Sequence, residues 1–288
     1  MLEHNEALQR ADCHCHTVHS DGSLTTIELL DLAKEKQLSG LSITDHDTLA
    51  AYDVASQYAK ELGIELVSGI EISTEHQRAS VHVLGYAFDL QAPELLTFCD
   101  QQQIYRQNRN DQILERLAKI NMPITLEEIH ARFPGQGTIG RPHMAALMVE
   151  KGYVTSAAQA FTRYLGNKGR CYVKGCFLEV ESAIDIIHKA GGFAVLAHPH
   201  YLEPKRLIKA LSLMPFDGIE VFYGRCNLTQ EKPWLTLAQE KNWLTTGGSD
   251  FHGAKTPYQP LGCSWTPSEV FDIFKKRFQS HSQNILPN

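Results

Sequence analysis

The sequence predicts an α/β fold in which parallel strands form a barrel-type sheet, helices lie outside it and a helical cap is inserted midway. Short apolar strands alternate with amphipathic helices up to about residue 90, and the alternation resumes near residue 173. The intervening residues are largely helical and polar, without a convincing strand. We therefore expect a discontinuous barrel domain of residues 11–92 and 173–280, interrupted by a cap domain of residues 93–172.

Four short apolar runs in the first part predict strands, at residues 11–15, 41–44, 65–68 and 81–88. Ile27, Leu30 and Ala33 recur at helical spacing and predict a helix over 25–37. A second helix is predicted near 50–62. After the cap, the pattern predicts strands at 193–197, 218–222 and 243–246, and helices at 180–190, near 204–213 and near 229–241. Reactive side chains are expected at the carboxyl ends of such strands.

The composition and charge limit which classes of protein the chain can belong to. The 288 residues are 43% hydrophobic and carry a formal net charge of −6, which argues against a broad electrostatic grip on nucleic acid or an anionic membrane. A nucleotide substrate is still compatible, because metal ions can supply positive charge locally. We recognise no signal peptide or membrane-spanning run, and the seven cysteines have no zinc-finger spacing. We expect a cytoplasmic chain with reduced thiols and no membrane partner, and leave its oligomeric state open.

The first cluster of candidate functional side chains is DCHCH at residues 12–16. Asp21 follows it in a glycine-containing turn. Residues two apart on a strand share one face, so His14 and His16 point together, whereas Cys13 and Cys15 point away. Two such imidazoles can chelate one metal ion, and Asp21 can add an oxygen ligand. A lone histidine is usually structural, but this pair followed by a carboxylate favours a metal site.

The middle of the first part adds three candidates. His46 ends an apolar strand, where Asp45 and Asp47 could orient its ring, although Asp47 could instead cap the next helix. Glu71 lies between apolar neighbours, and a buried carboxylate needs a cation or strong donors. A salt-bridged Glu71 is the alternative of equal weight. His82, within an apolar strand, also needs a partner.

Two late clusters complete the set. His198 ends a buried-type strand, and Asp250 with His252 repeats the two-residue spacing with one oxygen and one nitrogen ligand. Mixed imidazole and carboxylate ligands suit Mn, Fe or Zn better than Mg or Ca. Six histidines and three acids exceed the needs of one ion, so two or three ions are implied.

These clusters lie in blocks that resemble the signature of the PHP (polymerase and histidinol phosphatase) phosphoesterases, namely DCHCHTVHSDG, ITDHDT, GIEIS, VHVLGY, LAHPH and GSDFH. The resemblance runs from about residue 12 to residue 252. It implies a distorted (β/α)7 TIM-like barrel and three divalent metal ions, with Mn expected and Fe or Zn as alternatives. It also implies one ligand group for each ion, with Glu71 bridging: His14, His16, Glu71 and Asp250; Asp21, His46 and His252; Glu71, His82 and His198.

Within the family, the chain is most similar to the subgroup that contains ribonuclease AM and the 3′,5′-nucleoside bisphosphate phosphatases. Its members have an inserted helical cap with blocks similar to IGRPH at 139–143 and YLGNKGR at 164–170. This chain has Gly140 where related sequences often have Thr, and His200 where they often have Gly. We expect His200 to be a packing variation rather than a substrate contact.

Basic side chains of the cap are predicted to bind the substrate. Arg141 stands directly before a proline, which suits a first helical turn, and its guanidinium and the helix amides would clamp a phosphate. Lys168, Arg170 and His143 are the other predicted substrate contacts, with solvated surface as the alternative for the basic groups. Arg141 would also stabilise developing charge, and His143 or His198 could donate a proton to the leaving oxygen.

The resemblance to this subgroup implies the removal of the 3′-phosphate from nucleoside 3′,5′-bisphosphates, and it allows 5′-to-3′ exonuclease activity on short RNA as a second activity. The partner is then a nucleotide or a short single-stranded RNA. Tyr105, Phe133 and Tyr164 of the cap could stack a base, or could be core residues. A histidinol-phosphate phosphatase, or another small-molecule phosphomonoesterase, is the alternative enzyme. A degenerate metal- or nucleotide-sensing module is the non-enzymatic alternative, and the complete ligand set disfavours it.

Overall fold

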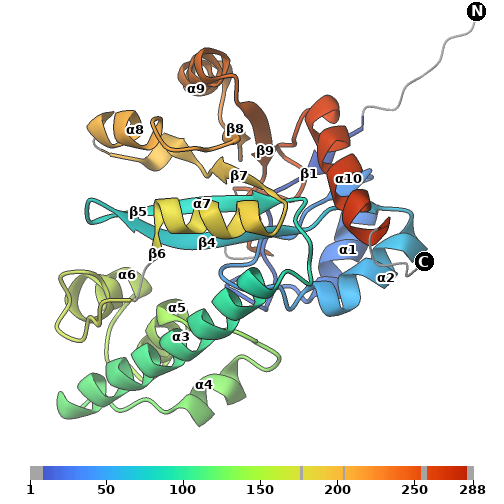
Figure 1. The fold of residues 1–288 in the computed structure, drawn as a ribbon. Coiled ribbons are helices and arrows are strands. Elements are labelled where there is room, and N and C mark those ends of the chain that lie inside the picture. Colours follow the sequence, from blue (N-terminus) through green and yellow to red (C-terminus); the bar gives the residue numbers. More distant parts are fainter. Residues whose placement is uncertain (1–8, 176–177, 204, 254–257, 284–288) are drawn as a thin grey trace, which may run out of the picture.

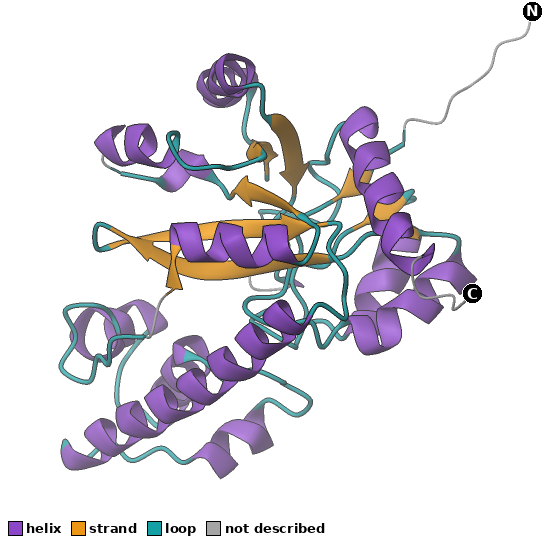
Figure 2. Ribbon diagram, in the orientation of Figure 1, coloured by secondary structure: helices purple, strands orange, loops and turns teal. Residues whose placement is uncertain are grey.

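A computed structural model describes residues 9–175, 178–203, 205–253 and 258–283 (Figure 1). The chain has an α/β fold with one sheet of three strands and one of six (Figure 2). Helices lie around the sheets, and the helices from the middle of the chain gather on one side of them (Figure 1). The predicted helix at 204–213 starts with Pro204, which lies outside the described residues.

The small sheet is parallel and contains β1 (Ala11–Asp12), β2 (Gly40–Leu41) and β3 (Glu65–Leu66) in that order. The predicted helices between them are present as α1 (Thr26–Glu35) and α2 (Tyr52–Leu62). Each strand is shorter than predicted, because the residues that follow leave the ladder and enter the loops at the carboxyl end of the sheet. These loops form the site described below.

The large sheet is mixed. Its strands, in spatial order, are β6 (Leu178–Glu179), β4 (Gly69–His76), β5 (Ala79–Tyr86), β7 (Phe193–Leu196), β8 (Gly218–Tyr223) and β9 (Leu244–Gly248). β5 is antiparallel to both β4 and β7, whereas the remaining neighbours are parallel. The prediction of parallel strands throughout is therefore wrong at β5, and β4 is not among the predicted strands.

The turn at Gln77 and Arg78 explains this difference. Both residues have positive φ, 50° and 67°. Positive φ at both central positions is the conformation of a type I′ turn, whose twist matches that of the two strands it joins. Glycine or asparagine usually signals such a turn, and this chain has neither at these positions. The sequence therefore contains no visible hairpin signal here.

Backbone hydrogen bonds link the two sheets at two places. The amide of Asp250, beyond β9, donates to the carbonyl of His14, beyond β1 (2.7 Å). The amide of Asp47, beyond β2, donates to the carbonyl of Glu71 in β4 (3.1 Å). The first bond joins the segments after β9 and β1 to each other, and the second places the loop after β2 beside β4.

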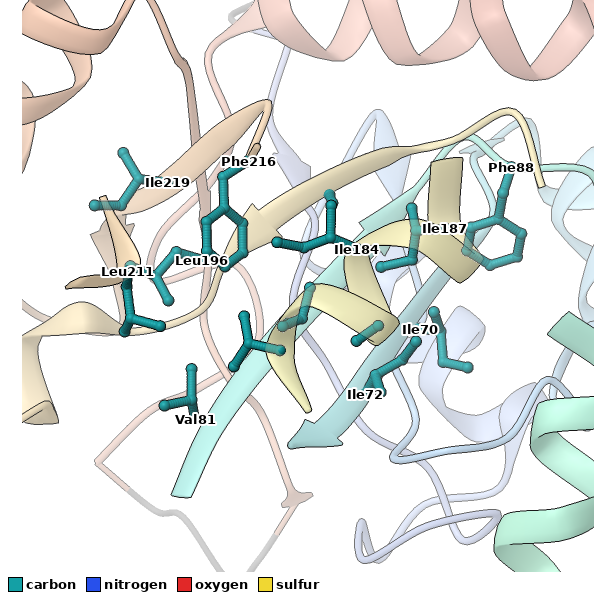
Figure 3. Close-up of a cluster of buried hydrophobic side chains, with 14 of the residues drawn as sticks. Ile70, Ile72, Val81, Phe88, Ile184, Ile187, Leu196, Leu211, Phe216 and Ile219 are labelled. Atoms are coloured by element: carbon teal, nitrogen blue, oxygen red, sulfur yellow. The ribbon is translucent and has the colours of Figure 1, made fainter. Parts of the chain in front are cut away.

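The main hydrophobic core lies between the large sheet and its helices. α7 (Val180–Lys189) covers the β4–β5 hairpin, and Ile184 and Ile187 point into the same cluster as Ile70 and Ile72 of β4 (Figure 3). α8 (Lys205–Leu211) and α9 (Leu228–Lys241) add further apolar side chains to this cluster. The sheet is thereby fixed on the face away from its polar loops.

A C-terminal helix, α10 (Ser268–Gln283), closes a second cluster and is not among the predicted elements. Phe274 of α10 stacks on Tyr86 with ring centroids 4.9 Å apart. The Tyr86 hydroxyl donates to the carbonyl of Cys13 (2.8 Å). The helix therefore supports the segment that leads to the first histidine pair.

The middle of the chain forms a helical segment, with α3 (Pro93–Lys119), α4 (Leu126–Arg132), α5 (Arg141–Glu150), α6 (Ala157–Ala160) and the π-helical turn η1 (Phe161–Leu165). Its buried side chains, among them Ile113, Leu117, Met144 and Met148, form a cluster of their own. The predicted helical character of this region is confirmed, and the domain boundaries at 93 and 172 stay a prediction.

Two further findings apply to the described residues. No helix among them is both long and apolar enough to cross a membrane. All of the described cysteines are free. Cys176 lies outside the described residues.

Replacing Phe274 tests the contribution of α10 to stability. Its side chain is fully buried (0% exposed), so Phe274→Ala should leave a cavity and lower the free energy of unfolding by about 3–5 kcal/mol. Ile273→Ala, at a 40% exposed position of the same helix, is the control and should cost at most about 1 kcal/mol. Urea unfolding followed by circular dichroism measures both values. Equal costs for the two variants would contradict this packing.

Candidate metal centre

All of the predicted metal ligands lie together at the carboxyl ends of parallel strands and on the β4–β5 hairpin. They are His14, His16 and Asp21 after β1, His46 after β2, Glu71 in β4, His82 in β5, His198 after β7, and Asp250 and His252 after β9. The two cysteines next to His14, Cys13 and Cys15, are buried in hydrophobic clusters, as the strand alternation predicts.

The first group of ligands surrounds Oε2 of Glu71 and Oδ1 of Asp250. Nε2 of His14 and Nε2 of His16 each lie 3.2 Å from the Glu71 oxygen. The same nitrogens lie 3.3 Å and 3.2 Å, respectively, from the Asp250 oxygen. Two imidazole nitrogens and two carboxylate oxygens thus face one small space.

The second group surrounds Asp21. Its Oδ1 lies 3.1 Å from Nε2 of His252 and 3.8 Å from Nδ1 of His16, and its Oδ2 lies 4.0 Å from Nε2 of His46. The donor atoms of these four residues all lie within 4.8 Å of one another. His16 therefore stands between the first two groups.

The third group surrounds the other oxygen of Glu71. Its Oε1 lies 2.7 Å from Nδ1 of His82 and 2.9 Å from Nε2 of His198. Those two nitrogens are 3.3 Å apart. His46 joins the second group to the first, because its Nδ1 lies 3.4 Å from Oε2 of Glu71, and it also lies within ligand distance of His82. Glu71, only 1% exposed, is thus common to the first and third groups.

The backbone is strained where it presents two of the ligands. His198 has φ 25° and Asp250 has φ 53°, values that cost residues other than glycine about 1–3 kcal/mol each. Close packing adds a further demand. A Cβ atom on Gly248 would lie 2.4 Å from the Cβ of His14, so only glycine fits beside that ligand.

Asp45 holds the loop after β1 and does not orient His46. Its carboxylate accepts hydrogen bonds from the Thr17 amide (2.7 Å), the Thr17 hydroxyl (2.6 Å) and the Ser20 hydroxyl (2.5 Å). The hypothesis that Asp45 orients the His46 ring is therefore wrong. The loop closes on Asp45 because its hydroxyl and amide donors have no ladder partner once the chain has left β1.

Asp47 also has a different role from either one predicted. It accepts hydrogen bonds from the Ser73 amide (2.8 Å) and from Arg106 of α3 (2.6 Å). The N-cap of α2 is Ala51, so Asp47 caps no helix. Asp47 instead connects the loop after β2 to the hairpin and to the helical segment.

Glu220 is a functional residue that the sequence reasoning missed. Its side chain is fully buried; Oε1 lies 2.8 Å from Nδ1 of His14, and Oε2 accepts the amide of His198 (2.8 Å). A carboxylate on Nδ1 fixes the tautomer that turns the Nε2 lone pair toward the cluster. The signal was present, because Glu220 lies between apolar residues of a strand, as Glu71 does.

The charges in the cluster stabilise one another. Burial alone would lower the pKa of His14, but Glu220, Asp250 and Glu71 raise it well above its usual value. Burial would raise the pKa of Glu71, yet His46, His82 and His14 hold it well below its usual range. The field of these ionised acids favours positive charge inside the cluster. A bound divalent cation would satisfy the same field.

The donor set fits divalent cations. Nε2 of His16 and Nδ1 of His46 are buried and make no hydrogen bond, although a carboxylate oxygen lies 3.2 and 3.4 Å away, respectively. Such nitrogens point at a common space rather than at a single acceptor. Neutral imidazole and carboxylate donors are ligands of Mn, Fe and Zn.

A cleft of about 350 Å³ opens beside the cluster and is lined by Asp21, His46 and His82. Its opposite wall carries Arg106 and Arg109 of α3 and Arg141 of α5. Burial, Arg141 and Arg106 together lower the pKa of Arg109 to about 10. Nη2 of Arg109 is buried without a hydrogen-bond partner. Arg106 is already paired with Asp47, whereas Arg109 and Arg141 have no carboxylate partner among the described residues. An anion bound in the cleft would relieve the repulsion among the three guanidinium groups.

The predicted contacts of the cap differ in where they lie. Arg141 lines the cleft, donates to the Leu165 carbonyl (3.0 Å) and lies over the ring of Tyr172 (5.8 Å). His143 also lines it, and its Nδ1 accepts the amide of Gly140 (3.0 Å), so the neutral ring has its proton on Nε2. His143 thereby completes the N-terminal cap of α5.

The loop after η1 contains the other two predicted contacts. Lys168 and Arg170 are exposed, and among the described residues that line the cleft this loop contributes Asn167 instead. Arg106 and Arg109 were missed by the sequence reasoning. Their approach to the cluster depends on how α3 lies against the strands, which no local motif reveals.

The remaining candidates are mostly packing residues. His200 stacks on Tyr223 (5.7 Å) and meets Trp234 edge to face (5.6 Å), which agrees with the expected packing role. Phe133 and Tyr164 pack against the core of the helical segment. Of the three cap aromatics, Tyr105 is the one that lines the cleft.

Comparisons with known proteins agree with this site. Residues 12–183 match the family model described as the PHP domain. The 5′-3′ exoribonuclease Rnm of Escherichia coli K12 is 35% identical over 272 residues, 92% of each protein. The 3′,5′-nucleoside bisphosphate phosphatase of Chromobacterium violaceum is 30% identical over 253 residues, 84% of this chain and 86% of that protein.

Solved structures give the same result. A crystal structure from Bifidobacterium adolescentis, named as a metal-dependent phosphoesterase, is similar with a TM-score of 0.82 and 32% identity. The match covers 93% of this chain and 96% of that one. Taken with the ligand cluster, these similarities show that the chain belongs to the PHP domain family of metal-dependent phosphoesterases.

Proposed function

We propose that this chain removes the 3′-phosphate from nucleoside 3′,5′-bisphosphates and, as a second activity, degrades short RNA from its 5′ end. The adjacency of the metal centre and the arginine cleft carries this proposal. Both substrates present a 5′-phosphorylated terminal nucleotide, and two phosphates call for two cationic subsites. The names of the relatives, a 5′-3′ exoribonuclease and a 3′,5′-nucleoside bisphosphate phosphatase, support both activities.

The proposal includes three divalent ions, with Mn as the native metal and Fe or Zn as alternatives. The three groups of donor atoms support this number. When bound, the ions would supply an activated water at neutral pH and neutralise the phosphoryl oxygens. We assign His198 to metal binding rather than to proton donation, because its Nε2 faces Glu71 and His82.

The side chains outside the cluster have separate tasks in this scheme. The guanidinium groups of Arg106, Arg109 and Arg141 bind the 5′-phosphate and orient the nucleotide. Arg141 also stabilises charge that develops on the scissile phosphate. His143, which holds its proton on Nε2 when neutral, donates a hydrogen bond within the cleft. Lys168 and Arg170 remain proposed contacts for the distal part of an oligonucleotide.

Three further sequence predictions, the closed barrel, the cap domain and the cellular location, also remain proposals. A closed, distorted (β/α)7 barrel is supported by the backbone bonds that join the small sheet to both β4 and the segment after β9. A cap domain at 93–172 is supported by the separate hydrophobic cluster of the helical segment. The cytoplasmic location of the chain is a prediction from the sequence alone.

Histidinol phosphate is the main alternative substrate. It has one phosphate and, with that phosphate at the metal centre, would leave Arg109 and Arg141 of the cleft without an anion. The arginine cleft therefore favours a bisphosphate. A sensing module without catalysis is disfavoured, because each of the three donor groups is complete.

Removing a ligand tests the metal-dependent reaction. His14→Ala or Asp250→Ala should lower phosphate release from adenosine 3′,5′-bisphosphate by at least about 1,000-fold, since several kcal/mol of charge stabilisation are lost. Circular dichroism should show an unchanged fold. Glu65→Gln, an exposed carboxylate of β3, is the control and should retain full activity. Substantial turnover by either ligand variant, with its metal content verified, would argue against the scheme.

Replacing Glu220 tests whether its carboxylate orients the ligand His14. Glu220→Gln keeps the shape of the side chain but weakens the bond to Nδ1 of His14, so metal affinity or kcat should fall about 10–100-fold. Isothermal titration with Mn and steady-state kinetics measure the two effects. Affinity and kcat equal to those of the unaltered protein would show that Glu220 does not tune the site.

Arg141 tests the subsite for the 5′-phosphate. Arg141→Ala should reduce kcat/KM for adenosine 3′,5′-bisphosphate about 10–100-fold, because a charge-assisted contact is lost. Adenosine 3′-phosphate lacks the 5′ anion, so it should lose only the part of the effect that arises at the scissile phosphate and be affected less. Arg163→Ala, an exposed residue of η1, is the matched control. Equal losses for both substrates would place the effect of Arg141 at the scissile phosphate alone.

A further inference from the structure

Tyr201 is an exposed aromatic side chain beside the metal centre. It ends the 3-10 helix η2 (Pro199–Tyr201), which directly follows the ligand His198, and is 68% exposed. Its ring centroid lies 6.4 Å from that of His198. It lies 5.5 Å from the ring of Tyr223, which it meets edge to face at 85°. Tyr223 in turn donates a hydrogen bond to Asp250 (2.5 Å).

The wall behind Tyr201 is rigid. Tyr223 is held at its hydroxyl by Asp250 and at its ring by His200, which stacks on it at 26°. The short helix is closed by the Tyr201 amide, which donates to the His198 carbonyl (3.2 Å). Tyr201 therefore stands against a fixed surface, while most of its ring area remains in solvent. That arrangement lowers the entropy cost of stacking a planar ligand.

Tyr201 and the arginine cleft adjoin different members of the cluster. The described lining of the cleft includes Asp21, His46 and His82 but neither His198 nor Tyr201. Tyr201 instead adjoins His198. A substrate anchored in the cleft and extending across the metal centre would therefore reach Tyr201 on the far side.

We propose that Tyr201 stacks the base of the second nucleotide of a single-stranded RNA substrate. This inference rests on the proposed function, in which the 5′-phosphate of the first nucleotide lies in the arginine cleft. Water adds to the phosphorus that joins the two nucleotides, the bond from phosphorus to O3′ breaks, and O3′ takes up a proton. The second nucleoside stays attached to that phosphorus through its O5′.

Tyr201 would therefore contribute to the cleavage of RNA but not to the phosphatase reaction. A nucleoside 3′,5′-bisphosphate has only oxygen where RNA carries its second nucleoside, so it cannot reach Tyr201. An aromatic side chain accepts any base, because every base presents a π face. Tyr201 should therefore support cleavage of RNA without selecting its sequence, and should leave the phosphatase reaction unchanged.

The test measures kcat/KM for two substrates, adenosine 3′,5′-bisphosphate and the 5′-phosphorylated diribonucleotide pApA, with Mn as the added metal. Tyr201→Ala should lower kcat/KM for the dinucleotide about 10-fold, the lost stacking of one base, and leave the bisphosphate value within about 2-fold. Tyr201→Phe keeps the ring and should retain activity on both substrates. Leu213→Ala, a 77% exposed position in the turn after α8, is the control for a lost surface side chain.

Several outcomes would overturn the inference. Equal losses on the two substrates in Tyr201→Ala would mean that the tyrosine acts through His198, and no loss on either would mean that RNA does not contact it. A loss in Tyr201→Phe as large as that in Tyr201→Ala would exclude stacking. An unaltered enzyme that hydrolyses the bisphosphate but not the dinucleotide would remove this inference together with the proposed activity on RNA, and would leave the proposed phosphatase activity standing. Hydrolysis of neither would contradict the proposed function itself.

Discussion

One buried carboxylate, Glu71, is the constraint on which the site depends. Its two oxygens face imidazole rings from several loops, and its own pKa is held far below its usual range by three of them. A carboxylate buried in this way is costly unless positive charge surrounds it. The β4–β5 hairpin meets part of this demand, since the antiparallel register puts His82 opposite Ser73, on the same face of the sheet as Glu71. The remaining partners come from loops after parallel strands.

Both the parallel and the antiparallel parts of the mixed sheet therefore position ligands. Parallel strands bring their carboxyl ends together, which explains why His14, His46, His198 and Asp250 meet. The hairpin adds a carboxylate and an imidazole from strand interiors, where hydrogen bonds on both sides fix the backbone. Precise placement of this kind suits a carboxylate whose two oxygens face different groups of ligands. The helical segment then adds the guanidinium groups that give the neighbouring cleft its positive charge.

Much of this site could be predicted from the sequence, because its ligands lie in short motifs. His14 and His16 share a face through the alternation of an extended segment, and the amphipathic patterns of α1 and α7 are local. The hairpin turn escaped prediction because Gln77 and Arg78 adopt positive φ without the usual residues. Glu220 could have been found by the argument applied to Glu71. Arg106 and Arg109 could not, because their approach to the site depends on the tertiary placement of α3.

The central claim is that distant strand ends share multivalent cations through Glu71. Elemental analysis of the purified chain by mass spectrometry, before and after Glu71→Gln, tests it most directly. The account predicts about three ions per chain for the unaltered protein and the loss of at least two of them in the variant, with the secondary structure retained. A chain that purifies and is reconstituted without bound metal, or a variant that keeps the full complement, would contradict the account.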